Sequence, residues 1–339
     1  MDQDFLAMNY EAPLWLPGGN LQTIWPALYS RRVAGARVPY RRERWNTPDG
    51  DFIDVDFGAW PFAANRPMLV LFHGLEGSSR SHYAEAFADY ARSRGIAFAV
   101  PHFRGCSGEI NLAPRAYHSG DFEEIDWILR RLRKQQQPQG GVLIAVGVSM
   151  GGNALMRWAE EMGAQAHDTV AAVAAVSAPL DLTASGHAIG CGFNRQVYTR
   201  MFLRTMVPKA LRKLAQHPGL FSRERLLAVR DLHDFDNVFT APLHGYRDTD
   251  DYWSRASAKP HLREICIPAL LVNARNDPFV PASSLPRQDE VAASVMLWQF
   301  AQGGHVGFAQ GRLPPGHVHA IPNVVGNWLA SRVGAIVTA

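Results

Sequence analysis

Six short, mainly apolar runs constrain the fold of this chain more than any other feature of the sequence. They cover residues 68–72, 96–100, 142–148, 171–177, 269–273 and 295–300, and each is followed by polar or turn-forming residues. Runs without polar alternation are typical of strands that are covered on both faces of a parallel sheet. Helical spacing of apolar residues occurs between them, at 81–94, 121–134 and 151–162. This alternation predicts an α/β fold with a mostly parallel sheet and helices on both faces.

Residues 182–260 interrupt the alternation because they contain no clear strand. We expect residues 1–181 and 261–339 to form one core, with an irregular N-terminal wrap over residues 1–42. We expect residues 182–260 to form a mainly helical lid inserted at the C-terminal edge of the sheet. Within the lid, residues 195–213 combine basic and apolar side chains. We favour a solvated helix face there over peripheral contact with an anionic membrane.

Composition excludes several classes of function. The net charge of +3 is too small to indicate nucleic acid as a partner. Three cysteines without C-x-x-C spacing fit a reduced compartment, and no His/Cys/Asp grouping has zinc-like spacing. No phosphate-binding glycine loop follows a strand either. From these two observations we expect no metal and no cofactor. With no secretory signal and no apolar run of 18 residues, we expect a cytoplasmic protein without a membrane span.

The segment Gly147-Val148-Ser149-Met150-Gly151 matches G-x-S-x-G, the nucleophile elbow. The elbow needs a strand before the serine and a helix after it, and both are expected here. Glycines two positions on either side of the serine let the neighbouring strand and helix approach closely. The helix N-terminus behind the serine favours developing negative charge. The pattern therefore predicts Ser149 as a nucleophile.

A nucleophilic serine needs backbone N–H groups to stabilise the oxyanion. In this kind of site one N–H comes from the residue after the nucleophile and one from an earlier strand–helix loop. The loop His73-Gly74-Leu75-Glu76-Gly77 directly follows the run at 68–72. We expect the amides of Leu75 and Met150 to form the oxyanion hole.

The serine also needs a base, and the base needs an acid that orients it, in the chain order Ser, Asp, His. His305 lies in a glycine-rich segment after the last apolar run, which favours it over His317 and His319. Asp277 follows the run at 269–273 and is favoured over Asp181, which would serve as a cap or hinge at the start of the lid. The remaining candidates are assigned structural roles, because lone histidines are usually structural: His73, His82, His102 and His118.

Longer blocks of sequence carry a family resemblance. The segment WLPGGNLQTIW (residues 15–25) is similar to the N-terminal signature of the YheT-like branch of α/β-hydrolases, the AB-hydrolase 4 family. The segments HGLEGS (73–78) and FRGCSGE (103–109), the Ser149 elbow and NDP (276–278) are similar to further blocks of that family. The resemblance covers roughly residues 10–330. It implies the α/β-hydrolase fold, ester hydrolysis and a triad of Ser149, Asp277 and His305 without a cofactor.

Two details of these blocks carry separate expectations. Asn20 stands where the family pattern has histidine, and its distance from the triad in sequence suggests no catalytic consequence. Arg104 is expected to hold a glycine-permitted turn in preference to forming a wall of the acyl pocket, with Cys106 as a small packed residue.

These observations predict a serine carboxylic-ester hydrolase that acts on a small-molecule ester with a short or medium acyl chain. Acyl transfer to an alcohol is the alternative within the same chemistry, because only the acceptor differs. A catalytically silent scaffold used for binding is the alternative from another class, and a missing triad member would favour it. No member is missing.

Overall fold

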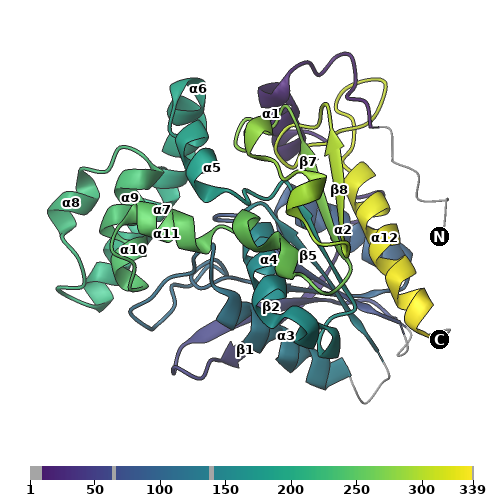
Figure 1. The fold of residues 1–339 in the computed structure, drawn as a ribbon, viewed down its shortest axis with the longest axis horizontal. Coiled ribbons are helices and arrows are strands. Elements are labelled where there is room, and N and C mark those ends of the chain that lie inside the picture. The colour runs from purple at the N-terminus through teal and green to yellow at the C-terminus, as the bar shows by residue number, and fades with distance from the viewer. Residues whose placement is uncertain (1–9, 63–65, 137–140, 338–339) are drawn as a thin grey trace.

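The computed structural model describes residues 10–62, 66–136 and 141–337. These residues form an eight-stranded sheet in the order β1-β2-β4-β3-β5-β6-β7-β8, with helices on both faces (Figure 1). Neighbours from β4 to β8 pair in parallel, whereas β1 and β2 pair antiparallel at one edge. The strands are β1 (Tyr40–Asn46), β2 (Phe52–Gly58), β3 (Met68–Phe72), β4 (Ala97–Pro101), β5 (Leu143–Val148), β6 (Ala172–Val176), β7 (Ala269–Ala274) and β8 (Val295–Phe300).

The mostly parallel α/β fold is confirmed, and each of the six apolar runs forms a strand whose ends lie within one residue of those expected. Strands β1 and β2 were not expected. Their opposed residues include Arg42 with Asp56 and Arg44 with Asp54, and both pairs form ion pairs, at 2.7 and 2.8 Å. The aspartates of β2 interrupt the continuous apolar run that is typical of the parallel strands, although Ile53, Val55 and Phe57 between and beside them are buried. Cross-strand ion pairs add to the stability of such a pair of strands.

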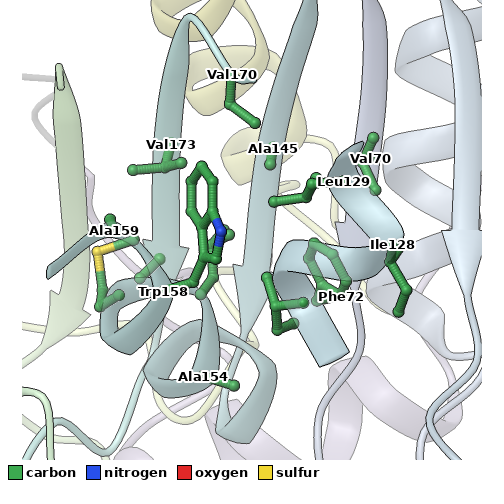
Figure 2. Close-up of a cluster of buried hydrophobic side chains, with 14 of the residues drawn as sticks. Val70, Phe72, Ile128, Leu129, Ala145, Ala154, Trp158, Ala159, Val170 and Val173 are labelled. Carbon is green, nitrogen blue, oxygen red and sulfur yellow. The ribbon is translucent and has the colours of Figure 1, made fainter. Parts of the chain in front are cut away.

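Helices cover the two faces of the sheet with separate apolar cores. Figure 2 shows Leu129 of α3 (Phe122–Gln136) and Trp158 of α4 (Met150–Met162) packed over Val70, Ala145 and Val173 of the sheet. On the other face, α2 (His82–Ser93) and α12 (Ala320–Val337) cover the sheet with their own apolar side chains. Complete burial of one large side chain contributes about 1.5–3 kcal/mol. The two cores therefore fix the sheet, and with it the edge at which β3 to β8 end.

The N-terminal segment contains a helix where irregular structure was expected. Residues 1–9 of the expected wrap lie outside the described residues, and α1 spans Gly19–Leu28. In Figure 1 this helix lies above the ends of β7 and β8. The backbone of Gly19 is so close to Asn276 that an added Cβ would lie 1.9 Å from its carbonyl oxygen. Helix α1 therefore packs directly on the loops that follow the last two strands.

The chain between β6 and β7 forms helices and turns, gathered at one side of the sheet (left in Figure 1). It begins and ends at neighbouring points, because Lys259 N–H donates to the Leu180 carbonyl oxygen at 2.9 Å. Within the described residues, no helix has the length and apolar character needed to cross a membrane. The helices of this segment are α5 (Leu182–Ile189), α6 (Gly192–Asn194), the π-helical η4 (Arg195–Thr199), α7 (Arg200–Gln216), α8 (Arg223–Leu227), α9 (Leu232–Val238), α10 (Thr240–Leu243), α11 (Thr249–Ala256) and the 3-10 helix η5 (Lys259–Glu264).

Candidate active site

Ser149 lies at a sharp turn between β5 and α4, with φ 53° and ψ −124°. Its N–H donates to the Val176 carbonyl oxygen at 2.9 Å, which fixes the turn against β6. The flanking glycines are required by close approach. A Cβ on Gly147 would lie 2.3 Å from the Gly151 carbonyl oxygen, and one on Gly151 would lie 2.4 Å from the His73 carbonyl oxygen. The turn thus presents the serine side chain at the C-terminal edge of the sheet.

The structure brings Ser149, His305 and Asp277 together from the ends of three strands. His305 Nε2 lies 2.9 Å from Ser149 Oγ, and its Nδ1 lies 2.9 Å from Asp277 Oδ2. Asp277 is buried, and its other oxygen accepts hydrogen bonds from the N–H groups of Phe279 and Val280. These bonds leave one carboxylate oxygen aimed at the imidazole. The arrangement can remove a proton from Ser149 and stabilise the imidazolium that forms.

The rival residues lie elsewhere. Asp181 is the N-cap of α5, where its carboxylate accepts a hydrogen bond from Ala184 N–H at 2.9 Å. His317 pairs through its backbone with Gln310 and Arg31, and its ring stacks on that of His319. Of the residues weighed, Asp277 and His305 therefore complete the hydrogen-bonded chain to Ser149.

The two residues whose amides are expected to form the oxyanion hole are Leu75, in the loop after β3, and Met150, directly after the serine. Met150 is the first residue of α4, so its N–H has no acceptor within the helix. Around Leu75, the Gly74 N–H donates to Tyr83 Oη at 2.8 Å and the Glu76 N–H donates to Tyr117 Oη at 3.0 Å. Two tyrosine hydroxyls thus fix the loop on either side of the Leu75 amide. Leu75, Met150 and Ser149 all line the same cavity.

Three of the other histidines hold loops through hydrogen bonds. His73 accepts from Phe103 N–H and donates to the Gly74 carbonyl oxygen, and burial lowers its pKa to about 3. His82 donates to the carbonyl oxygen of Val306, beside His305, and burial lowers its pKa to about 4. His102 contacts Asp56 at 3.0 Å. The neutral rings of His73 and His82 support the oxyanion loop and the His305 loop from outside.

A cavity that opens to solvent lies between the sheet edge and the inserted helices, with Ser149 and His305 in its wall. Its charged members are engaged with other groups, for example Lys209 with Glu76 at 2.9 Å. Among the described residues, no three His, Cys, Asp or Glu side chains are grouped to hold a metal ion. The apolar lining comes largely from the insertion and includes Leu182, Ile189, Phe202, Met206, Leu232, Phe235 and Phe239.

The turn at Arg104 has the structural role that was favoured. Its guanidinium, which is buried, binds the carboxylates of Asp49, Asp51 and Glu124. The same residue also lines the cavity. Burial raises the pKa of the Cys106 thiol to about 12, so this cysteine is neutral at physiological pH.

The basic stretch of the insertion is only partly a solvated face. Arg200, Arg204 and Arg212 are exposed. Lys213 is instead buried, and its ammonium donates to the carbonyl oxygens of Asn111 and Ala113. Burial lowers the pKa of Lys213 to about 8. Part of the positive charge thus fastens α7 to the core, a contact that the sequence pattern did not reveal.

Sequence reasoning missed the residues of α1 that contact the site. Gln22 and Thr23 hydrogen-bond to the loop that carries His305, although both belong to the quoted N-terminal block. Asn20, to which no consequence was assigned, accepts a hydrogen bond from Tyr198 Oη at 2.9 Å. The Tyr198 ring packs on Phe279, whose ring lies 4.2 Å from that of His305. Distance along the sequence was therefore a poor guide to distance from the triad.

Comparison with known proteins places the chain among α/β hydrolases. The family model described as alpha/beta hydrolase fold matches residues 67–311. The Escherichia coli K12 protein named "Putative esterase YheT" is 40% identical over 93% of this chain and 88% of its own length. The mouse protein named phospholipase ABHD3 is 28% identical over 82% of this chain and 68% of its own.

Solved structures agree on the fold. The Pyrococcus furiosus esterase Pf2001 superposes with a TM-score of 0.51 and 17% identity, over 91% of this chain and 97% of that one. Mouse alpha/beta hydrolase domain-containing protein 10 superposes with a TM-score of 0.54 and 14% identity, over 86% and 99% of the two chains. Together with the sequence matches, these likenesses lead to one conclusion: the chain belongs to the α/β-hydrolase superfamily, in its YheT-like branch of esterase-type hydrolases.

Proposed function

We propose that this protein is a serine carboxylic-ester hydrolase in which Ser149, His305 and Asp277 form the catalytic triad. The observation that carries the proposal is the continuous chain of two 2.9 Å contacts, from Ser149 Oγ through the imidazole to a buried carboxylate. A serine becomes an effective nucleophile when a base accepts its proton and an acid orients that base. The names of the relatives, which include esterase, phospholipase and monoacylglycerol lipase, support the same reaction class.

In the first step His305 Nε2 accepts the proton of Ser149 Oγ while that oxygen attacks the ester carbonyl. The N–H groups of Leu75 and Met150 donate to the oxyanion of the tetrahedral intermediate. Loss of one such donor typically raises the barrier by about 2.7–4 kcal/mol. The intermediate collapses when His305 returns the proton to the leaving alkoxide, and an acyl-Ser149 ester remains.

Water completes the reaction. His305 accepts a proton from a water molecule as the water oxygen attacks the acyl carbonyl, and the same two amides stabilise the second oxyanion. Collapse breaks the bond to Ser149 Oγ, His305 protonates that oxygen, and the carboxylic acid leaves. Asp277 stays ionised throughout and stabilises the imidazolium through its contact with Nδ1.

The cavity supports an apolar acyl chain as the part of the substrate that is buried. Leucine, isoleucine and phenylalanine side chains of the insertion line it beside Ser149. An apolar pocket favours acyl chains over charged groups, and each buried CH₂ contributes about 0.8 kcal/mol. We therefore propose esters of short to medium acyl chains as substrates, with kcat/KM rising along the series until the cavity is filled.

The test uses p-nitrophenyl esters of increasing acyl length with the wild-type protein and with Ser149→Ala. The proposal predicts measurable turnover by the wild type, an optimum at short to medium length, and loss of nearly all activity in Ser149→Ala. Equal turnover by the two folded proteins would refute the proposal. Product analysis with added alcohol separates hydrolysis from acyl transfer, because transfer yields a new ester instead of the acid.

A further inference from the structure

The loop that carries His305 is strained and has little regular structure of its own. Gly303, Gly304, Val306 and Phe308 all have positive φ, and the loop follows β8 without a helix to anchor it. For Val306 and Phe308 this backbone region is unfavourable, so surrounding contacts must hold the loop in place. The groups that hold it therefore decide where the imidazole lies.

Gln22 of α1 joins this loop to the turn that carries Asp277. Its side chain is 1% exposed, and its Oε1 accepts hydrogen bonds from Gly303 N–H and from the Asn276 side-chain amide, both at 2.9 Å. Asn276 Oδ1 in turn accepts from Gly304 N–H at 3.0 Å. The Gln22 amide nitrogen donates to the Leu16 carbonyl oxygen, which fixes its orientation. One glutamine thus ties the base loop and the acid turn to each other.

Thr23 holds His305 itself. The Thr23 hydroxyl accepts a hydrogen bond from the His305 N–H at 2.9 Å and donates one to the Gly19 carbonyl oxygen at 2.7 Å. Both Thr23 and His305 are buried. Removal of the hydroxyl would leave the His305 N–H buried without its acceptor, which is costly enough to move the loop.

Close backbone contact makes the support rigid. A Cβ added at Gly307 would lie 1.7 Å from the Gln22 carbonyl oxygen, and one added at Gly304 would lie 2.7 Å from the Gln22 carbonyl carbon. With the contact between Gly19 and Asn276 described above, glycines on both sides let α1 pack against the two loops. The side-chain hydrogen bonds of Gln22 and Thr23 therefore join two segments whose backbones are in direct contact.

We propose that Gln22 and Thr23 are positioning residues of the triad, which hold His305 within hydrogen-bond distance of both Ser149 and Asp277. The inference rests on the proposed esterase function and adds to it a role for the N-terminal helix. Neither residue touches the reacting atoms. Their contribution lies in geometry, since a displacement of about 1 Å at a catalytic group lowers the rate about 100-fold.

The central test compares two substitutions at one position. Thr23→Val keeps the shape of the side chain but removes the hydroxyl, whereas Thr23→Ser keeps the hydroxyl. For Thr23→Val we expect kcat for a p-nitrophenyl ester to fall about 10- to 100-fold with KM changed less than twofold. Thr23→Ser should recover kcat to within about threefold of wild type. Gln22→Met, which removes the acceptor, should behave like Thr23→Val.

A second readout does not depend on turnover. The proton between His305 Nδ1 and Asp277 gives a low-field proton NMR resonance when the pair is held together. We expect this resonance in the wild type and in Thr23→Ser, and we expect it to be broadened or shifted in Thr23→Val. Ser294→Ala serves as control, because it removes a side-chain hydrogen bond to Ile265 at the opposite edge of the sheet. Its kcat and its resonance should match those of the wild type.

The positioning role is wrong if folded Thr23→Val keeps wild-type kcat and resonance, or if Thr23→Ser fails to recover what Thr23→Val loses. Thermal unfolding of every variant shows whether it folds. If Gln22→Met does not fold, the comparison of Thr23→Val with Thr23→Ser tests the proposal without it. A wild-type protein without ester turnover and without fluorophosphonate labelling at Ser149 would refute the proposed function instead. The NMR comparison would then still decide whether Thr23 holds His305 against Asp277.

Discussion

Strained residues gather beside the candidate site. In the part of the chain that the structure describes, the non-glycine residues with positive φ all follow the C-terminal ends of β3, β5, β6 and β8. They are Glu76, Ser149, Ser177, Val306 and Phe308. Such conformations cost on the order of 1–3 kcal/mol each and persist where surrounding contacts over-determine them. The hydrogen bonds of Tyr83, Tyr117, Gln22 and Thr23 are contacts of this kind.

The role of Asp277 as the acid can be tested by one substitution of nearly identical shape. Asp277→Asn keeps an oxygen that can accept from the N–H groups of Phe279 and Val280 but removes the negative charge that faces His305 Nδ1. We expect kcat to fall about 10⁴-fold, because the imidazole is held in the wrong tautomer. Steady-state kinetics with a p-nitrophenyl ester measures the loss, and circular dichroism checks the fold.

Asp181→Asn is the matched control for the acid. Asparagine caps a helix as well as aspartate does, so α5 should remain intact. We expect its kcat to stay within about twofold of wild type. If kcat fell strongly in Asp181→Asn and not in Asp277→Asn, Asp181 and not Asp277 would be the acid.

The sequence suffices to select Ser149, Asp277 and His305 as the candidate triad, but it does not reveal the residues that support them. Ser149, Asp277 and His305 each follow an apolar run, and the order of strands brings such positions to one edge of the sheet. Gln22 and Thr23 contact residues 281 and 282 positions away, and nothing in a single sequence reports such a contact. The glycines at 19, 304 and 307 are visible in the sequence, but their close approach to a neighbour is not.

A partly buried carboxyl joins three helices of the insertion. Asp236 of α9 accepts hydrogen bonds from Thr240 of α10 and from the Trp253 indole of α11. Burial raises the pKa of Asp236 to about 6. The pKa of Asp236 in the folded protein thus exceeds the unfolded value of about 3.9. The protonated carboxyl therefore contributes its full stability to the folded state at low pH, and this contribution is lost as the pH rises through 6.

Asp236→Asn should therefore stabilise the protein in a pH-dependent way. The amide can accept from Trp253 and donate to the Thr240 hydroxyl without a buried charge. Relative to wild type, we expect its free energy of unfolding to gain about 1–3 kcal/mol between pH 4 and pH 7.5. Urea unfolding at the two pH values measures this gain. A difference between the proteins that does not change with pH would contradict it.

An ion pair connects the insertion to the oxyanion loop. Lys209 of α7 contacts the Glu76 carboxylate, and Glu76 directly follows the Leu75 amide in the loop. Lys209→Met leaves a mostly buried carboxylate without its cation, which costs about 1–3 kcal/mol. We expect the loss of the cation to displace the oxyanion loop. The value of kcat/KM for an ester should then fall about tenfold.

Arg212→Met is the control for this ion pair, because Arg212 lies on the same helix but is exposed. It should leave kcat/KM unchanged within about twofold, since exposed charges contribute little. Equal activity of wild type and Lys209→Met, at low and at high salt, would show that the ion pair does not position the loop.

The parallel strands were predicted from the sequence, whereas the antiparallel pair was not. The runs that form β3 to β8 are continuous because helices cover both of their faces. Strands β1 and β2 lie at the edge and carry arginines opposite aspartates. In β2 these aspartates alternate with the buried Ile53, Val55 and Phe57, a pattern that a search for continuous apolar runs does not find. Helix α1 was not predicted either. Glycines at its start do not indicate a helix, and here they allow it to pack against distant loops.

The two apolar clusters on the faces of the sheet form without the insertion, whereas a smaller cluster joins Ile189 and Tyr198 of the insertion to Phe279, Val280 and Leu285 of the core. The two clusters on the faces of the sheet include no residue between 183 and 255, although both parts line the cavity. The insertion begins and ends at hydrogen-bonded neighbours, since Leu182 N–H also donates to the Ser257 hydroxyl at 2.9 Å. We therefore propose that the chain divides into a core and a lid, as the sequence leads us to expect.

Replacement of residues 183–255 by a short Gly–Ser linker tests that division. We expect the remaining chain to unfold cooperatively, because its cores are complete, and to lose the rise of kcat/KM with acyl length, because the apolar wall is gone. Thermal unfolding by circular dichroism and the p-nitrophenyl ester series measure both. An unfolded product, or an unchanged preference for acyl length, would contradict the division.

The most direct test of the central claim is to find the acyl group during turnover. Rapid acid quench of the wild-type protein with a p-nitrophenyl ester, followed by proteolysis and mass spectrometry, locates the covalent intermediate. We expect the mass of the acyl group on Ser149, and no acylated peptide in Ser149→Ala. An acyl group on another residue, or ester turnover by Ser149→Ala at the wild-type rate, would contradict it.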